Sequence, residues 1–217
     1  MIGDLLPDVV ATEVAYDDPP HARLEPEEEA VITRAVDKRR REFTTVRHCA
    51  RGALARLGVP YRPLVPGLRG APSWPDGVVG SLTHCDGFRA AAVAPADALA
   101  SVGIDAEPAL PLPEGVLNVV ALPVEQKLLA ELADAHPDTP WDRVLFSAKE
   151  SVYKAWFPLT RVFLDFSEAE LELAPDGTFT ARLLVPGPLV GGRRVEGFDG
   201  RWAVRDGLIA TAIAVRP

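Results

Sequence analysis

Cysteine is scarce in this sequence. Only Cys49 and Cys85 occur among the 217 residues. Two cysteines cannot build a disulfide framework, so we expect buried thiols in a reducing compartment. Each cysteine follows a histidine directly, whereas the ligands of structural zinc sites are usually separated by gaps of a few residues, which argues against such a site.

Long apolar runs and a basic charge excess are also missing. No apolar segment approaches the roughly 20 residues of a membrane span. The first residues, with Asp4, Asp8 and Glu13, lack the basic start of a secretory signal, so we expect a cytoplasmic protein without a membrane partner. The formal net charge of −8 argues against a general nucleic-acid binder, because phosphate backbones require a basic surface. No P-loop motif occurs, which argues against an ordinary NTPase of that class.

What is present is a mixture of helical and strand patterns. Pro26 and the three glutamates after it predict a helix start, and helical character continues to Leu57 with a break near Asp37. A loop rich in proline and glycine follows over residues 60–77. Helices resume at 125–135 and from Trp141. Strands are predicted at 78–82, 88–93, 101–108, 171–173, 179–185, 202–205 and 208–215.

The segment Leu145–Phe157 carries the clearest amphipathic pattern. At about 100° per residue one arc is apolar: Val144, Leu145, Ala148, Val152, Ala155 and Trp156. The opposite arc is polar: Lys149, Glu150, Tyr153 and Lys154. A carboxylate between two ammonium groups could hold a metal ion and neutralise phosphate oxygens. An ordinary surface pair between Glu150 and Lys154, at i and i+4, is the alternative.

The strand predicted at 101–108 has two faces. Val102, Ile104 and Ala106 point one way and Asp105 and Glu107 the other. Two carboxylates on one face can serve as oxygen ligands for Mg²⁺, with Glu150 available as a third. An acidic pair that faces solvent on an edge strand is the alternative.

Basic residues gather in the second helical segment. Lys38 to Arg41 are consecutive, and Arg40, Thr44, Arg47 and Arg51 follow one line at i, i+4, i+7 and i+11. Such a row can bind a phosphate group with charged, fork-shaped donors, which favours a small anionic ligand. A solvated face balanced by nearby glutamates is the alternative. Thr83 and His84, at the end of the predicted hairpin, could reach a ligand, although a lone histidine is often only a satisfied polar residue.

The predicted elements form two α+β halves, residues 1–103 and 104–217. Each half has a long amphipathic helix followed by β-hairpin material, without a repeat at the level of residues. We therefore expect two pseudo-symmetric α+β subdomains, with Asp105, Glu107 and Glu150 at their junction.

Three motifs resemble the Sfp-type 4′-phosphopantetheinyl transferases. They are V-G-I-D-x-E at Val102–Glu107, F-S-x-K-E-x-x-x-K at Phe146–Lys154 and S-L-T-H at Ser81–His84. The strings at Lys38–Arg51, Trp74–Cys85 and Tyr153–Thr160 are similar to the actinobacterial members. The resemblance covers roughly residues 30–217 and implies the two-subdomain fold with its active site at the interface.

The implied reaction transfers the 4′-phosphopantetheine arm of coenzyme A to a serine of an apo acyl or peptidyl carrier protein and leaves adenosine 3′,5′-bisphosphate. The carrier would serve fatty-acid, polyketide or nonribosomal-peptide synthesis. A Mg²⁺-dependent nucleotide or coenzyme A phosphohydrolase with the same carboxylates is the alternative enzyme. A coenzyme-binding module without activity is a third hypothesis, and it has no need for Glu150.

The resemblance also assigns residues. The metal ligands, for Mg²⁺ or Mn²⁺, would be Asp105, Glu107 and Glu150. Coenzyme A would be bound by Arg39, Arg47, Arg69, Thr83, His84, Asp105, Lys149 and Lys154. The catalytic groups would be Glu150 or Glu125 as base, directly or through a metal-bound water, and Lys154 on the leaving phosphate.

Two of these assignments depart from the simplest pattern. Relatives often carry a lysine before the W-P motif, but here Pro66 holds that place and Arg69 is the nearest cation. The helical wheel favours Arg40 beside Arg47, whereas the resemblance favours Arg39.

The segment Pro108–Val124 combines several prolines with leucines and valines that we expect to be exposed. An exposed apolar loop is typical of a docking surface, and we expect the carrier protein to bind there. We expect the enzyme to be a monomer.

Overall fold

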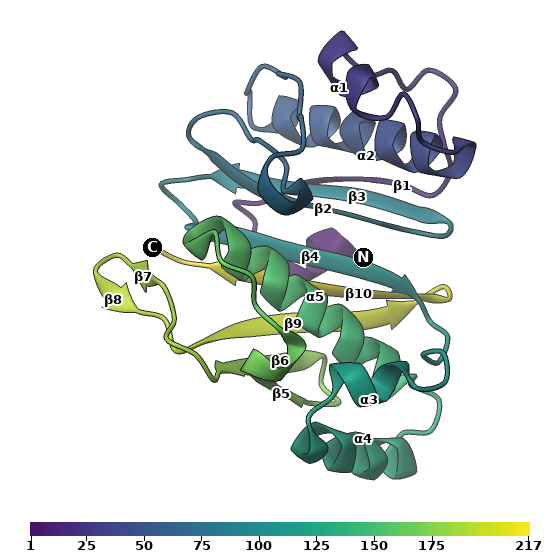
Figure 1. Cartoon of the computed structure of the whole chain (residues 1–217), viewed down its shortest axis with the longest axis vertical. Helices are drawn as coiled ribbons and strands as arrows, with labels where there is room; N and C mark the ends of the chain where they lie inside the picture. Colours follow the sequence, from purple (N-terminus) through teal and green to yellow (C-terminus); the bar gives the residue numbers. More distant parts are fainter.

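The computed structural model describes residues 1–217 and contains two large antiparallel sheets, each with a long helix on one face, and a small two-stranded sheet (Figure 1). The α-helices are α1 (Pro26–Val31), α2 (Asp37–Arg56), α3 (Val116–Val120), α4 (Pro123–Ala135) and α5 (Trp141–Thr160). The strands are β1 (Ala11–Ala15), β2 (Val78–Cys85), β3 (Phe88–Pro95), β4 (Ser101–Pro108), β5 (Ala169–Leu173), β6 (Thr178–Leu183), β7 (Leu189–Val190), β8 (Arg193–Arg194), β9 (Gly197–Arg205) and β10 (Leu208–Val215). Three short 3₁₀ turns complete the list: η1 (Ile2–Leu5), η2 (Leu68–Gly70) and η3 (Phe166–Glu168).

The N-terminal half is a three-stranded sheet, in the order β1-β3-β2, covered by α2. Side chains alternate along the central strand β3. Ala91 and Val93 pack against α2, whereas Phe88, Ala90 and Ala92 face the C-terminal half. Both faces of β3 are therefore buried, which explains its run of small apolar residues.

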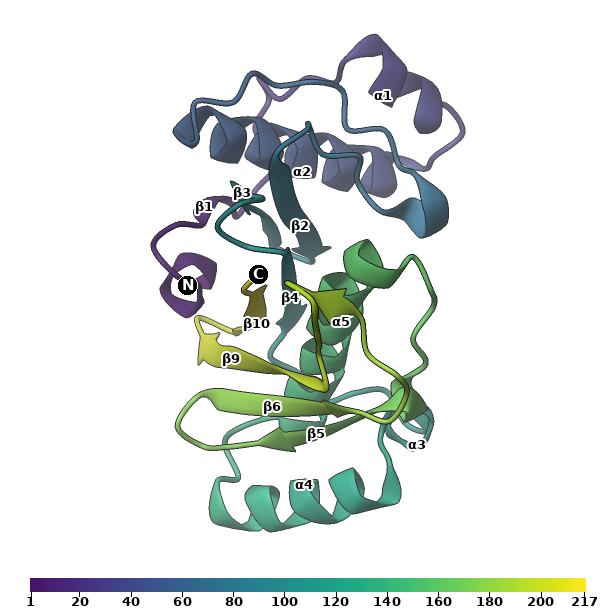
Figure 2. The ribbon, with the colours of Figure 1, turned by 90° about the vertical axis from the view of Figure 1, so that its left-hand side faces the viewer.

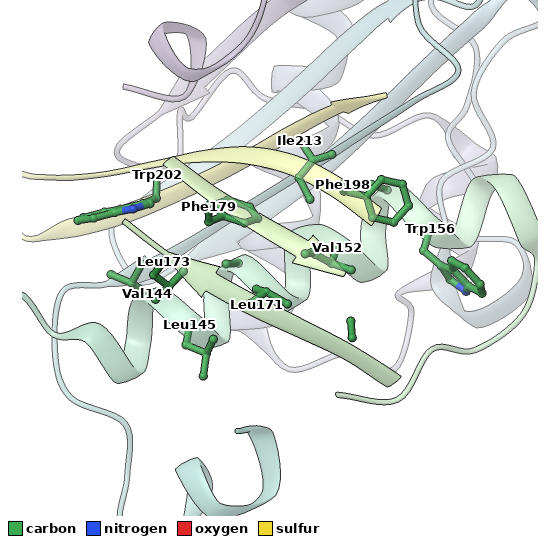
Figure 3. Close-up of a cluster of buried hydrophobic side chains, with 14 of the residues drawn as sticks. Val144, Leu145, Val152, Trp156, Leu171, Leu173, Phe179, Phe198, Trp202 and Ile213 are labelled. Carbon is green, nitrogen blue, oxygen red and sulfur yellow. The ribbon is translucent and has the colours of Figure 1, made fainter. Parts of the chain in front are cut away.

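The C-terminal half is a five-stranded sheet in the order β4-β10-β9-β6-β5, with α5 packed against one face. The predicted apolar arc of α5 is buried in full. Figure 3 shows Val144, Leu145 and Val152 of this helix beside aromatic side chains of the sheet. Gly103 lets β4 approach closely, because a Cβ there would overlap the carbonyl oxygen of Ser151 on α5.

The two halves join where β2 lies beside β4 (Figure 2). The two strands belong to different sheets, and side chains bridge them. The backbone N–H of Ile104 donates to Ser81 Oγ and that of Ala106 to Thr83 Oγ1, both at 3.1 Å. Two hydroxyls thus satisfy the backbone donors that the edge of β4 would otherwise leave unpaired.

The expected α+β class with two subdomains is confirmed, as is the break near Asp37, which separates α1 from α2. The predicted division after residue 103 falls inside β4, whereas the two sheets separate between β3 and β4. The sequence did not predict the strands β1, β7 and β8 or the helix α3. None of the helices has the length and apolar character that crossing a membrane requires.

Candidate active site

A cleft of about 700 Å³ lies between the halves. Its walls are α2 and β2 from the N-terminal half, the loop around η2, and β4 and α5 from the C-terminal half. Most of the residues predicted from the sequence line it: Arg39, Arg47, Arg69, Thr83, His84, Asp105, Glu150 and Lys154. Guanidinium groups thus share one cavity with two carboxylates and an ammonium group.

Asp105 is held at the junction of the two halves. Its side chain is only 6% exposed, and three side chains donate to its carboxylate. Oδ1 accepts from Lys154 Nζ at 2.7 Å and from Thr83 Oγ1 at 3.2 Å, and Oδ2 accepts from Ser147 Oγ at 2.8 Å. Because Thr83 belongs to β2 and the other donors to α5, the position of Asp105 depends on both halves.

The negative charge of Asp105 affects the pKa of both Glu107 and Glu150. Burial raises the pKa of Glu107, and Asp105 raises it further. Burial also raises the pKa of Glu150, with Asp105 adding to the shift and Lys154 opposing it. Neighbouring carboxylates with raised pKa values are a donor set that suits a hard divalent cation, which would relieve their repulsion.

The three carboxylates are not gathered into a ready coordination shell, since no group of three potential ligands is close enough to hold a metal ion. Glu107 does not line the cleft and forms an ion pair with Arg143 Nη1 at 3.0 Å. Arg143 also donates to the carbonyl oxygens of Leu110 and Pro111. Arg143 therefore ties Glu107 to the backbone of residues 110–111.

Arg47 gives the opposite wall a buried positive charge. The residue is 6% exposed, its guanidinium carbon lies 3.4 Å from the ring centre of Phe43, and Nη2 donates to the carbonyl oxygen of Leu64. Its Nε has no hydrogen-bond partner. Burial lowers the pKa of Arg47 to about 10, so the group stays charged at neutral pH. A buried cation with a spare donor is well suited to bind a phosphate group.

Arg39 and His84 form a second pair on this wall. Arg39 Nη1 lies 2.8 Å from His84 Nε2, and the carboxylate of Glu42 lies 3.6 Å from Nδ1. Burial lowers the pKa of His84; Glu42 opposes this shift, whereas Arg39 and Lys154 add to it. The imidazole is therefore neutral at pH 7, and Nε2 can accept a hydrogen bond from Arg39.

Comparison with known proteins identifies the family. The 4′-phosphopantetheinyl transferase N-terminal domain matches residues 27–94, and the 4′-phosphopantetheinyl transferase superfamily matches residues 101–204. The 4′-phosphopantetheinyl transferase Svp of Streptomyces mobaraensis is 65% identical over 219 residues, which cover 99% of this chain and 89% of Svp. Npt of Nocardia iowensis is 49% identical, over 99% of each chain. PptT of Mycobacterium tuberculosis is 47% identical, over 99% of this chain and 98% of PptT.

The chain belongs to the 4′-phosphopantetheinyl transferase superfamily. All three relatives are named 4′-phosphopantetheinyl transferases, and each matches this chain over most of its length. The resemblance predicted from the three motifs is therefore confirmed, and the phosphohydrolase alternative has no support.

Two residues predicted for the active site of this transferase lie elsewhere. Lys149 and Glu125 face each other at 2.9 Å with side chains that are each 1% exposed. Lys149 Nζ also donates to the carbonyl oxygens of Phe166 and Ala169, and Glu125 accepts from the N–H groups of Leu122 and Leu171. Every polar atom of the pair is thus engaged inside the C-terminal half, and neither residue lines the cleft.

Arg39 and Arg40 take different positions at the start of α2. Arg40 donates to the carbonyl oxygen of Ile32 and does not line the cleft, whereas Arg39 does. Arg40 and Arg47 lie seven residues apart within α2, on one side of the helix as the wheel predicts. The guanidinium of Arg40 nevertheless turns to the carbonyl oxygen of Ile32, before the helix. Arg69 lines the cleft with left-handed backbone (φ 54°), and its guanidinium carbon lies 4.8 Å from the ring centre of Phe163.

The sequence interpretation missed Ser147 and Arg143 in the transferase. Both lie on α5, one and two turns before Glu150, and they contact Asp105 and Glu107, respectively. The signal for Ser147 was available, because a serine beside the apolar arc of a buried helix needs a polar partner.

Proposed function

We propose that this transferase moves the 4′-phosphopantetheine arm of coenzyme A to a serine hydroxyl of an apo carrier protein and leaves adenosine 3′,5′-bisphosphate. The observation that carries the proposal is the cleft between the halves, where Asp105, Glu150 and Lys154 share one cavity with Arg39 and Arg47. A substrate with a diphosphate in its middle and a further phosphate on its nucleotide end needs such a distribution of charge.

The basic wall binds the nucleotide end of coenzyme A in this proposal. Arg47 offers a buried charge with an unpaired Nε, and Arg39 and His84 lie together on the same wall. Thr83 and Arg69 line the same cavity. Fork-shaped guanidinium donors suit the oxygens of a phosphate monoester.

Asp105, Glu107 and Glu150 are the proposed ligands of Mg²⁺, with Mn²⁺ as the alternative, because hard cations prefer carboxylate oxygens. Such an ion supplies neutralisation of the diphosphate charge. Lys154 lines the cleft at 2.7 Å from Asp105 and is the proposed group that stabilises the leaving phosphate.

Glu150 is the proposed base for the serine proton. It lines the cleft, and burial raises its pKa before a cation binds, so we propose that it takes the proton directly or through a metal-bound water. Glu125 is not proposed for this role because its carboxylate is buried and paired with Lys149.

The carrier protein is proposed to dock on the segment Pro108–Val124. Three of its apolar side chains are exposed: Leu110, Val119 and Val124. Arg143 binds the backbone of this segment while it pairs with Glu107, so the proposed dock lies next to the proposed metal ligands. Acyl and peptidyl carriers of fatty-acid, polyketide or nonribosomal-peptide synthases are the candidate acceptors.

We further propose that the enzyme works as a monomer in the cytoplasm. One chain supplies both walls of the cleft, and both cysteines are free thiols, as expected in a reducing compartment.

Release of adenosine 3′,5′-bisphosphate from coenzyme A and Mg²⁺, measured with and without an apo carrier protein, tests the proposal. A transferase releases the nucleotide only when the carrier is present, one molecule for each carrier molecule that it modifies. Release without the carrier would instead identify a phosphohydrolase, and no release under either condition would contradict both.

A further inference from the structure

Three hydroxyl groups lie behind Asp105, on the side away from the cleft. They belong to Ser147 and Ser151 of α5 and Thr211 of β10, and all three residues are 0% exposed. Ser147 Oγ lies 2.8 Å from Asp105 Oδ2 and 3.1 Å from Thr211 Oγ1, and Ser151 Oγ lies 2.6 Å from Thr211 Oγ1. The hydroxyls therefore form a continuous chain that ends on the carboxylate.

The direction of donation along this chain follows from the number of protons. An ionised carboxylate only accepts, so Ser147 donates its one proton to Asp105. Thr211 then donates to Ser147, either to Oγ or to the backbone oxygen at 2.9 Å. Thr211 Oγ1 can then accept from Ser151 Oγ at 2.6 Å, which is closer than the other acceptor of Ser151, the backbone oxygen of Thr211 at 3.2 Å. In both cases the proton of Ser147 stays committed to Asp105.

The two oxygens of Asp105 have different surroundings. Both donors to Oδ1, Thr83 and Lys154, line the cleft. The one donor to Oδ2, Ser147, is fully buried and does not line the cleft. Oδ2 is thus anchored to the helix core while Oδ1 is presented to the cavity.

Packing alone does not require these hydroxyls. Ala148 and Ala155 of the same helix are also 0% exposed, so small apolar side chains fit against the sheet. Burial of a hydroxyl costs free energy unless it is paired. Three buried hydroxyls that pair with one another and end on Asp105 therefore point to a role beyond helix packing.

We propose that Ser147 is a positioning residue for the transferase reaction. Thr211 and Ser151 hold its hydroxyl as a donor to Asp105, so that the Asp105 carboxylate keeps its other oxygen directed to the cleft. This inference rests on the proposed function, in which Asp105 is a ligand of the divalent ion. It predicts that residues without contact to substrate or metal affect how well that ion binds.

The test compares Ser147→Ala, Thr211→Val and Thr211→Ser with the wild-type enzyme. Binding of Mn²⁺ in the presence of coenzyme A, without a carrier, is measured by electron paramagnetic resonance, and kcat and KM are measured separately. Thr45→Val is the matched control, because Thr45 is also buried and donates to a carboxylate, that of Asp18, at 2.7 Å in the N-terminal half.

We expect Ser147→Ala to weaken Mn²⁺ binding by roughly tenfold, as is usual for groups that orient a metal ligand. Thr211→Val should act in the same direction, whereas Thr211→Ser, which keeps the hydroxyl, should bind Mn²⁺ like the wild type. The rate constant kcat should fall with little change in the KM for coenzyme A. Thr45→Val should lower the unfolding midpoint and leave Mn²⁺ binding unchanged.

Wild-type affinity and kcat in Ser147→Ala, with a loss of stability like that of Thr45→Val, would overturn the inference. If Ser147→Ala does not fold, the comparison of Thr211→Val with Thr211→Ser tests the inference instead. Equal Mn²⁺ affinity of these two variants would overturn it. A wild-type enzyme that modifies a carrier but binds no Mn²⁺ in this assay would also overturn it. A wild-type enzyme that modifies no carrier would instead refute the proposed function.

Discussion

Lys149 and Glu125 show how neighbouring residues in one motif take different tasks. Lys149 precedes Glu150 directly, yet its ammonium group lies inside the C-terminal half, where burial lowers its pKa against the opposing effect of Glu125. The pair connects α4 and α5 to the backbone around η3 and β5. A sequence pattern that places lysine on the polar arc of a helix does not reveal a buried carboxylate from another helix, so this role could not be predicted.

Replacing Lys149 by methionine should destabilise the enzyme strongly. The buried carboxylate of Glu125 loses its partner, and the loss of one member of such a pair typically costs about 3–5 kcal/mol. Urea unfolding followed by circular dichroism measures this loss. Lys127→Met removes a lysine from an exposed pair with Glu131 and serves as the control, with little expected change. Equal stability of the two variants would contradict the structural role of Lys149.

Glu150 carries the opposite kind of prediction, because its raised pKa makes ionisation unfavourable in the folded state. A folded-state pKa above the unfolded value of 4.5 gives stability that is present below pH 4.5 and is lost as the pH rises through the folded-state pKa. Glu150→Gln, which stays neutral, should therefore unfold at a higher temperature than the wild type at pH 7, without added metal, and transfer no phosphopantetheine.

The stability gain of Glu150→Gln should vanish near pH 4, where both side chains are neutral. Glu131→Gln, at an exposed position of α4, is the control and should show no such dependence on pH. A Glu150→Gln variant that is less stable than the wild type at pH 7 would contradict the conclusion that burial in the cleft disfavours the ionised form of Glu150.

At the scale of elements, the periodicity of the sequence correctly predicted β4 and α5, the two elements that hold the acidic residues. The alternation in β4 put Asp105 and Glu107 on one face, and the structure confirms that Val102, Ile104 and Ala106 face the shared core instead. The apolar arc of α5 is buried as predicted. Helix α3 was not predicted, because it is short and lies between prolines. A helical wheel gives the side of a helix on which a residue lies but not its partner, so it could not show that Arg40 donates to Ile32.

Helix α3 offers an element-scale test of the proposed carrier dock. Val119 is 77% exposed, whereas Val120 on the same helix is 3% exposed and belongs to the core. Val119→Glu should raise the KM for the apo carrier severalfold and leave coenzyme A binding unchanged, because a charge at an apolar contact is costly to desolvate. Leu189→Glu, at an exposed position of β7, is the control. An unchanged KM in Val119→Glu would remove the support for docking at this segment.

At the scale of the whole molecule, the active site exists only where the halves meet. The sequence predicted two α+β halves and named the acidic residues at their junction, but it could not predict how the sheets join. That depends on Ser81 and Thr83, which accept backbone hydrogen bonds from β4. It also depends on the core of small side chains shared by β3, β4 and β10. Thr83 takes part in both tasks, since it also donates to Asp105.

The most direct measurement is the intact mass of an apo acyl carrier protein after incubation with the enzyme, coenzyme A and Mg²⁺. The wild type should add one phosphopantetheine unit to the carrier, and a carrier with its acceptor serine changed to alanine should stay unmodified. Asp105→Asn should abolish the addition, because the carboxylate at the junction of the halves loses its charge. An unmodified carrier with the wild type, or full modification with Asp105→Asn, would contradict the central claim that this cleft performs the transfer.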